Sequence, residues 1–248
     1  MSTYQELKGL KIKYLSSDTS GDRVKEGEVF YNSKDFNLKA FVATAAFHSS
    51  GSMSTARFAL GGIGTQTAAL GFGGYIIGTG DKNSTEEYNG FGFSTGGNLG
   101  TARRSISGCG TQTAGLAFGG FNSLTATEEY GGTSWTEGGD LNTGRRNLAG
   151  AGTQTAGLAF GGSSTTVLSN TEEYDGSSWT ASGALNTARG DLAGAGTQTA
   201  GLAFGGNTTA VSSSNEEYNG TSWTESNSMN TARKYLAGAG IQTSALAF

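Results

Sequence analysis

The sequence is poor in the residues that most catalytic and metal sites use. Its 248 residues include one histidine, one cysteine and no proline. Cys109 has no second cysteine with which to form an intramolecular disulfide, and His48 and Cys109 together cannot supply the three or four ligands of a zinc site. A Walker-type phosphate loop and a serine or cysteine nucleophile motif are also missing. We therefore expect a protein that is not an enzyme and that binds no cofactor and no metal.

Long apolar runs are absent as well. No stretch approaches the roughly 20 apolar residues of a membrane helix, and the opening MSTYQELKGLKIKYL lacks the apolar core and cleavage site of a secretory signal. The net charge of −4 argues against wholesale binding to nucleic-acid phosphates. Large aliphatic residues are scarce, but disorder normally requires a high net charge too. We expect a folded protein without membrane insertion and without a nucleic-acid partner.

Glycine, by contrast, is abundant at 43 residues, and it belongs to a motif that recurs along the chain. The string GTQT, or GIQT in the last copy, starts at Gly64, Gly110, Gly152, Gly196 and Gly240. A Thr-Ala-Arg or Thr-Gly-Arg triplet precedes each copy, and an apolar stretch such as AGLAF follows it, closed by Gly-Gly in the first four copies. A segment ending in Glu-Glu-Tyr comes next. Five residues after each tyrosine stands an aromatic residue: Phe93, Trp135, Trp179 and Trp223.

One such unit of about 44 residues is interpreted as four short strands. The first covers RRNLAGAG and its equivalents, the second AGLAFGG, the third Glu-Glu-Tyr and the fourth Trp-Thr. Short strands at regular intervals, separated by turn residues, indicate an all-β sandwich, barrel or propeller, and a four-strand repeat of this length indicates propeller blades. We expect Trp135, Trp179 and Trp223 to lie buried or half-buried between blades, and Cys109 to fill a small core position.

The Gly-Gly doublet that closes the second strand, the tyrosine of the third and the tryptophan of the fourth resemble the kelch motif. The resemblance covers residues 38–248, where the copies are in phase. It implies an all-β, five-bladed β-propeller of four-stranded kelch-like blades.

The spacing also predicts how the ring closes. The chain ends at Phe248, after two strands of its last unit, and counting back from Thr55 places Phe47 at the tryptophan position and Val42 at the tyrosine position. The segment LKAFVATAAFHSSGSM would then supply strands three and four of that blade, which removes an open sheet edge.

The predicted domains are a short N-terminal attachment or capping segment, 1–37, and the propeller, 38–248. The first contains two alternating stretches, LKIKYLSS and GEVFYN, which predict a two-stranded β appendage. An isolated hairpin is barely stable, so we expect it to pack on the propeller or on another chain.

Two charged features repeat with the motif. Adjacent strand residues face opposite ways, so the glutamates of a Glu-Glu pair cannot share one catalytic site; they are solvated or pair with arginine. The arginine of each triplet is expected at the mouth of the central channel, with further charge from Arg104, Arg146 and Lys234. It either pairs with a glutamate or binds an anionic ligand such as a carboxylated or sulfated glycan. The candidate ligand-binding residues are Arg57, Arg103, Arg145, Arg189 and Arg233.

Variation between the copies is concentrated in the loops after the Gly-Gly doublets: YIIGTGDKNS, FNSLTAT, SSTTVLSN and NTTAVSSS. Variable loops on a constant scaffold are typical of a binding surface.

The opening, with its SSD and GEVFYNS segments leading into GTQTAGLAFGG repeats, resembles structural proteins of marine tailed phages. That resemblance implies a non-enzymatic virion structural protein, in a tail fibre or other appendage, made in the host cytoplasm. Its partners would be other virion proteins through residues 1–37, together with a host-surface glycan or protein; a homo-oligomer is left open. The alternative is a cellular kelch-type protein-interaction module or lectin.

Overall fold

The structure is a computed structural model that describes residues 13–15, 29–32, 37–40 and 50–248. Every regular element among them is a β-strand. The chain divides into two units, Met1–Ser49 and Ser50–Phe248. His48 and Phe47 lie outside the described residues, so the predictions that concern them stay open.

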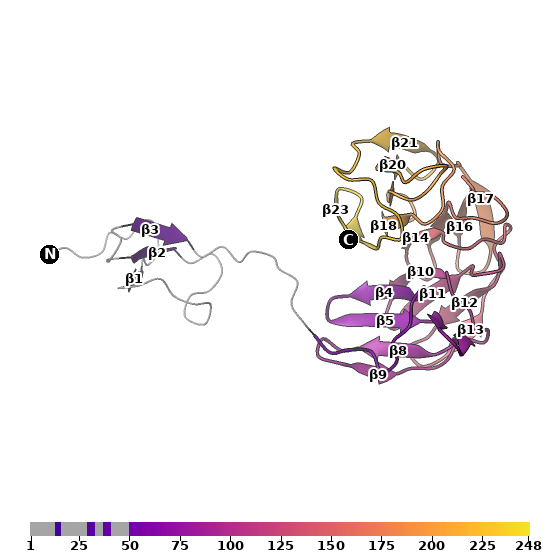
Figure 1. Ribbon diagram of the computed structural model, residues 1–248, viewed down its shortest axis with the longest axis horizontal. Helices are drawn as coiled ribbons and strands as arrows, with labels where there is room; N and C mark the ends of the chain where they lie inside the picture. The colour runs from indigo at the N-terminus through magenta and orange to yellow at the C-terminus, as the bar shows by residue number, and fades with distance from the viewer. Residues whose placement is uncertain (1–12, 16–28, 33–36, 41–49) are drawn as a thin grey trace. The chain divides into compact units, whose positions relative to one another are not determined.

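The N-terminal unit contains one three-stranded sheet (Figure 1). Its strands are β1 (Lys13–Leu15), β2 (Val29–Asn32) and β3 (Asn37–Ala40). β1 pairs parallel to β2, and β2 pairs antiparallel to β3 with Asn32 opposite Asn37. The two predicted alternating stretches therefore do contain paired strands, and a third strand joins them. Leu38–Ala40, which the repeat spacing assigns to the propeller segment, pair with β2 in this sheet.

The second unit is a β-propeller with four complete blades, as the repeat predicts. Each blade is an antiparallel sheet in which the strands pair in chain order. The first two blades are β4 (Gly61–Thr65), β5 (Ala68–Phe72), β8 (Thr85–Tyr88) and β9 (Phe93–Thr95), then β10 (Ser107–Thr111), β11 (Ala114–Phe118), β12 (Thr127–Tyr130) and β13 (Trp135–Glu137). The next two are β14 (Ala149–Gly152), β15 (Gly157–Phe160), β16 (Thr171–Tyr174) and β17 (Trp179–Ser182), then β18 (Ala193–Gly196), β19 (Gly201–Phe204), β20 (Asn215–Tyr218) and β21 (Trp223–Ser226).

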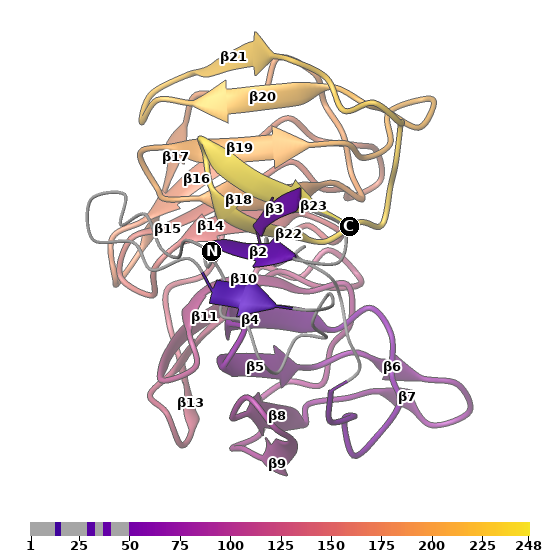
Figure 2. The ribbon, with the colours of Figure 1, turned by 90° about the vertical axis from the view of Figure 1, so that its left-hand side faces the viewer.

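The blades surround a common axis through their first strands. These contact one another in the order β4, β10, β14, β18 and then β22 (Gly238–Ile241). Figure 1 shows them toward the middle of the propeller and the fourth strands β9, β13, β17 and β21 at its outside. Figure 2 gives the view turned by 90°, in which the strands of the last blades follow one another outward from β18 to β21.

Small residues allow the first strands to approach the axis. A Cβ atom on Gly194 would lie 2.5 Å from Cζ of Phe160, a residue of the preceding blade, so only glycine leaves room for that ring. The doublet Gly161-Gly162 is required for a different reason: both residues have positive φ angles, 64° and 97°, at the turn that ends β15.

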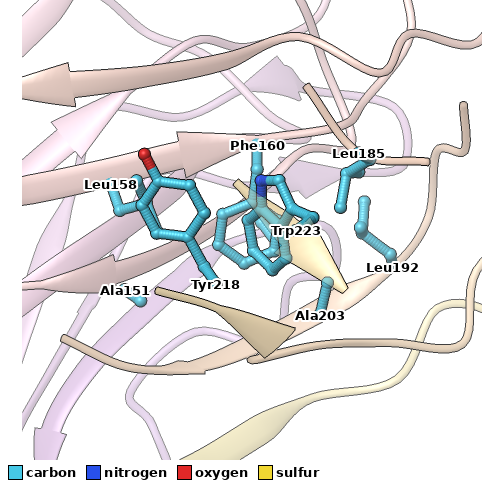
Figure 3. Packing of buried hydrophobic residues seen from close by; sticks show 9 residues of the cluster. Ala151, Leu158, Phe160, Leu185, Leu192, Ala203, Tyr218 and Trp223 are labelled. Carbon is cyan, nitrogen blue, oxygen red and sulfur yellow. The ribbon is translucent and has the colours of Figure 1, made fainter. Parts of the chain in front are cut away.

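The core lies between neighbouring blades. Trp223 of the fourth complete blade packs on Phe160 of the third, with ring centroids 4.8 Å apart, and on Tyr218 of its own blade at 4.9 Å. Figure 3 shows this cluster, in which Leu185 and Leu192 come from the connection that joins the two blades. Trp179 and Trp135 make the same contacts one and two blades earlier, and all three tryptophans are buried, as predicted.

After the fourth complete blade the chain forms half a blade. β22 and β23 (Ser244–Ala247) make a two-stranded sheet. Among the described residues no third strand pairs with β23. The predicted partner segment lies largely in residues 41–49, outside the described residues.

Candidate functional site

The connections between strands divide the propeller into two ends. In each blade, the turn between strands one and two (Thr-Gln-Thr) and the turn between strands three and four lie at one end. The loops between strands two and three and the linkers between blades lie at the other, which we call the loop face. Every lysine and arginine of residues 50–248 belongs to a loop or linker of the loop face: Arg57, Lys82, Arg103, Arg104, Arg145, Arg146, Arg189, Arg233 and Lys234. The positive charge of this unit is therefore confined to one end.

Four of the five candidate arginines form buried ion pairs with the first glutamate of the Glu-Glu segment in the blade they enter. Arg145 Nη2 lies 3.0 Å from Glu172 Oε1, and both side chains are almost completely buried. Nη1 of Arg145 also donates to the carbonyl groups of Gly161 and Asn170, at 3.2 and 2.6 Å. The equivalent pairs are Arg57–Glu86, Arg103–Glu128 and Arg189–Glu216.

This arrangement supports the structural alternative for these arginines. Each guanidinium joins the end of the second strand to the start of the third, beneath the loop between them. Burial lowers the pKa of Arg145 to about 10, with Glu172 acting in the opposite direction, so the group stays charged at neutral pH. The four Nε–H groups have no partner among the described residues. With side chains 0–1% exposed, these arginines have almost no surface for a ligand.

Arg233 differs from the other four. It is exposed, and its Nη1 donates to the carbonyl of Ala247 at 3.3 Å. None of the five arginines lines the cavity of about 600 Å³ at the first strands, whose lining consists mainly of glycine and alanine together with the larger apolar residues Met53, Leu60, Ile63, Leu70, Phe93 and Phe248. The channel mouth is thus not where the guanidinium groups gather. Ligand binding by the arginines stays a prediction, and burial disfavours it for four of them.

The other repeated polar residues also serve to join neighbouring blades. Tyr174 donates its hydroxyl to Glu129, the second glutamate of the preceding blade, at 2.6 Å. Trp179 Nε1 donates to Thr127 Oγ1 of that blade at 3.0 Å. Gln154 Nε2 reaches back to the carbonyl groups of Gly115 and Tyr130. The constant residues of the motif are therefore already engaged inside the propeller.

Cys109 is buried, as predicted, and its thiol donates to the carbonyl of Thr153 at 3.3 Å. Burial raises the pKa of this thiol to about 12, which leaves it protonated and unreactive at neutral pH.

A ring of unusual backbone conformation lies where the first strands begin. In each of the five repeats, one residue other than glycine has a positive φ angle of 52–56°. These residues are Ala59, Ser105, Asn147, Asp191 and Tyr235. We call these five residues the crown. The N–H of each crown residue after the first donates to the carbonyl of the preceding one, at 2.8, 3.1, 2.9 and 2.9 Å along the chain. These main-chain hydrogen bonds connect the five repeats in chain order, from the first to the last.

The crown residue differs in all five copies of the linker. Each crown residue and the residue before it lie between the repeated arginine and a leucine or isoleucine. The five dipeptides are Phe58-Ala59, Arg104-Ser105, Arg146-Asn147, Gly190-Asp191 and Lys234-Tyr235. Left-handed backbone is costly for residues other than glycine, yet the chain uses glycine at nineteen other positive-φ positions and at none of these five. Side chains are retained here despite the strain, and such outliers point to function.

Sequence reasoning missed the crown, although the printed repeats contain a signal for it. The residues between the repeated arginine and the next leucine or isoleucine differ in every copy, while the neighbouring strands are nearly identical. In three copies the residue immediately after the repeated arginine is also a cation, and Arg104, Arg146 and Lys234 are less buried than Arg103, Arg145 and Arg189.

Aromatic and charged side chains gather around the crown over the first two blades. The guanidinium carbon of Arg104 lies 3.7 Å from the ring centroid of Phe121 and 4.5 Å from that of Tyr75. Arg104 also forms an ion pair with Asp81 at 2.7 Å. Tyr75 and Asp81 belong to a hairpin, β6 (Tyr75–Ile76) and β7 (Gly80–Asp81), within the first variable loop.

The described residues contain no group of three or more His, Cys, Asp or Glu side chains placed to hold a metal ion. No helix long and apolar enough to span a membrane was found among them either. Comparison with known proteins found no matching family model and no matching curated protein.

Proposed function

We propose that residues 50–248 are a recognition module that binds its target with the loop face. One observation carries this proposal: the first glutamate of each Glu-Glu pair, the repeated tyrosines and tryptophans, and four of the five repeated arginines are bonded within and between blades, whereas exposed side chains that differ between the copies lie on the loop face. Ile77 and Val211, in the first and last of the variable loops, are 83% and 42% exposed. A constant, internally satisfied scaffold that presents different side chains at one end suits binding rather than catalysis.

We further propose that the module belongs to a virion appendage, such as a tail fibre, and binds a glycan or protein of the host surface. The support is the phage resemblance of the opening segments together with an N-terminal unit that has its own sheet and could serve as an attachment point. In this proposal residues 1–37 contact other virion proteins.

The virion assignment is tested by mass spectrometry of purified particles. The protein should be present at a fixed copy number, and a chain lacking residues 1–37 should fold but be missing from the particles. Presence in the particles without these residues would remove their attachment role. Absence of the full chain from particles, combined with co-purification of a cellular partner, would favour the cellular interaction module or lectin instead.

We also propose that the fold is a five-bladed, kelch-like ring closed by a blade split between the two ends of the chain. The support comes from residues 50–54, which contact the first blade as the end of a fourth strand would. The backbone N–H of Ser54 donates to Glu86 at 2.7 Å, as the equivalent residues Gly100 and Asn142 donate to Glu128 and Glu172, also at 2.7 Å. The hydroxyl groups of Ser50 and Tyr88 are hydrogen-bonded, as are those of Ser182 and Tyr218.

Hydrogen exchange distinguishes a closed ring from an open one. If strands from residues 38–54 complete the last blade, the outward-facing amides of β23 should exchange slowly in the full chain and in a chain starting at residue 38. In a chain starting at residue 55 the same amides should exchange rapidly, while those of β14 stay protected. Rapid exchange of the β23 amides in the full chain would contradict closure.

A further inference from the structure

We propose that the crown and the residues beside it form a binding site for an anionic sugar, a saccharide unit that carries a carboxylate or sulfate group. The inference rests on the proposed recognition function and names the part of the loop face that determines specificity. Arg146 and Lys234 would contact the anionic group, Asn147 and Asp191 the hydroxyl groups, and Tyr235 the apolar face of the sugar ring.

The first support is that the charged groups of two cations beside the crown have no hydrogen bond or ion pair among residues 50–248, although each lies near an aromatic ring. Arg146 lies 5.6 Å from the Phe121 ring centroid, and its guanidinium has no hydrogen bond or ion pair with any of residues 50–248. Lys234 lies 5.3 Å from the Tyr235 ring and is likewise without an ion pair among those residues. Arg104, by contrast, already has Asp81. Unpaired cations on a partly exposed face can offer charge-assisted hydrogen bonds to an incoming anion.

The second support is that these cations belong to one cluster. Asn147 and Asp191 are consecutive in the crown and are linked by the Asn147 Nδ2–Asp191 Oδ1 hydrogen bond at 2.7 Å. Arg146 and Lys234 directly precede Asn147 and Tyr235, and main-chain hydrogen bonds of 2.9 Å join Asp191 to both of these crown residues. Burial raises the pKa of Asp191, and Asn147, Lys234, Tyr235 and Arg146 act in the opposite direction. Two cations against one carboxylate leave a net positive site, while Asp191 still offers oxygen acceptors for sugar hydroxyl groups.

The third support is an exposed aromatic surface at the same position. Tyr235 is a crown residue, and its side chain is 73% exposed. Phe58, which precedes crown residue Ala59, is 53% exposed. Aromatic rings combine a flat apolar face with a preference for neighbouring polar groups, which suits a sugar ring. Asp81, Asp140 and Asp191 also lie at this end. Their negative charges oppose nonspecific attraction of polyanions, so specific contacts are needed for anion binding.

The test measures the affinity of the full-length protein for immobilised saccharides, in three classes: carboxylated, sulfated and neutral. Arg146→Ala and Lys234→Ala should each weaken binding of the anionic class about tenfold or more, the effect of losing a charge-assisted hydrogen bond. Their melting temperatures should match that of the unmodified chain. Asp191→Asn should tighten anion binding, because it removes a negative charge and keeps the hydrogen-bonding shape. The carboxylated and sulfated arms identify which anionic group is recognised.

Lys82→Ala is the matched control. It removes one positive charge from the loop face, but Lys82 lies in the first variable loop, where its Nζ donates to the carbonyl of Thr79, and it does not belong to the Asp191 cluster. It should change affinity by less than about twofold. Equal losses for Lys82→Ala and Lys234→Ala would overturn the crown site in favour of nonspecific attraction. Binding of neutral saccharides or a protein receptor alone would overturn the anionic-sugar inference while leaving the recognition module intact. Failure to bind any component of a target surface would contradict the recognition module itself.

Discussion

Replacing Arg145 with alanine should lower the free energy of unfolding by about 3–5 kcal/mol, the range for removing one partner of a buried ion pair. The substitution leaves the Glu172 carboxylate buried with its main cation gone, since both side chains are almost inaccessible to water. It also removes the donors to the carbonyl groups of Gly161 and Asn170. Equilibrium denaturation with urea measures the change.

Arg146→Ala is the control for that experiment, because it removes the same type of side chain at the next position. Arg146 is only partly buried and lacks an ion pair among the described residues, so its loss should change stability by about 0.5 kcal/mol or less. The double variant Arg145→Ala with Glu172→Gln should recover part of the loss, since the unpaired charge is gone. A loss below about 1 kcal/mol for Arg145→Ala would mean that water reaches this pair.

Replacing Trp179 with alanine should also cost about 3–5 kcal/mol, as expected for deleting a large aromatic side chain from a core. Trp179 is 5% exposed and lies between two blades, with ring centroids 5.0 Å from both Phe118 and Tyr174. Thermal or urea unfolding of the variant would show the loss, and a change below about 1 kcal/mol would contradict the position between blades.

Trp179→Phe separates the packing from the hydrogen bond. Phenylalanine occurs naturally at this position in the first blade, as Phe93, which packs on Tyr88 with centroids 4.9 Å apart. The variant should therefore keep most of the packing and lose mainly the bond to Thr127, at a cost of about 1 kcal/mol. A loss as large as that of Trp179→Ala would show that the indole bond, and not the ring, dominates.

The fold of each blade could be predicted from the sequence because its determinants are local and repeat. The Thr-Gln-Thr turns and the Gly-Gly doublets each mark a strand end, and the tryptophans mark a core position. Because several copies of the motif are in phase, only one assignment of the strands fits all of them. Closure is a different kind of problem. It depends on pairing between segments about 200 residues apart, and the segment before residue 50 has diverged from the motif, with Ala40, Phe41 and Val42 where other units have Glu-Glu-Tyr.

The candidate site was predicted less well, for two physical reasons. The repeated arginine looked available because its sequence neighbours do not reveal that a loop covers it; the ion pair with a glutamate about 25–29 residues later is a tertiary contact. The crown was overlooked because its left-handed backbone is held by main-chain hydrogen bonds, which leave no characteristic residue type. A position usually occupied by glycine or asparagine has here accepted alanine, serine, aspartate and tyrosine as well.

The main-chain bonding of the crown has a consequence for how such a protein can change. Each crown residue is connected to its neighbours by main-chain N–H and carbonyl groups, and Asn147 and Asp191 are joined by a side-chain hydrogen bond as well. The main-chain bonds are the same whichever side chain a crown residue carries, provided that it has an N–H group and adopts the left-handed conformation, so proline is excluded and β-branched residues are disfavoured. The repeats can therefore differ at the crown on a common frame, and new specificities become accessible through single substitutions or through the exchange of whole blades.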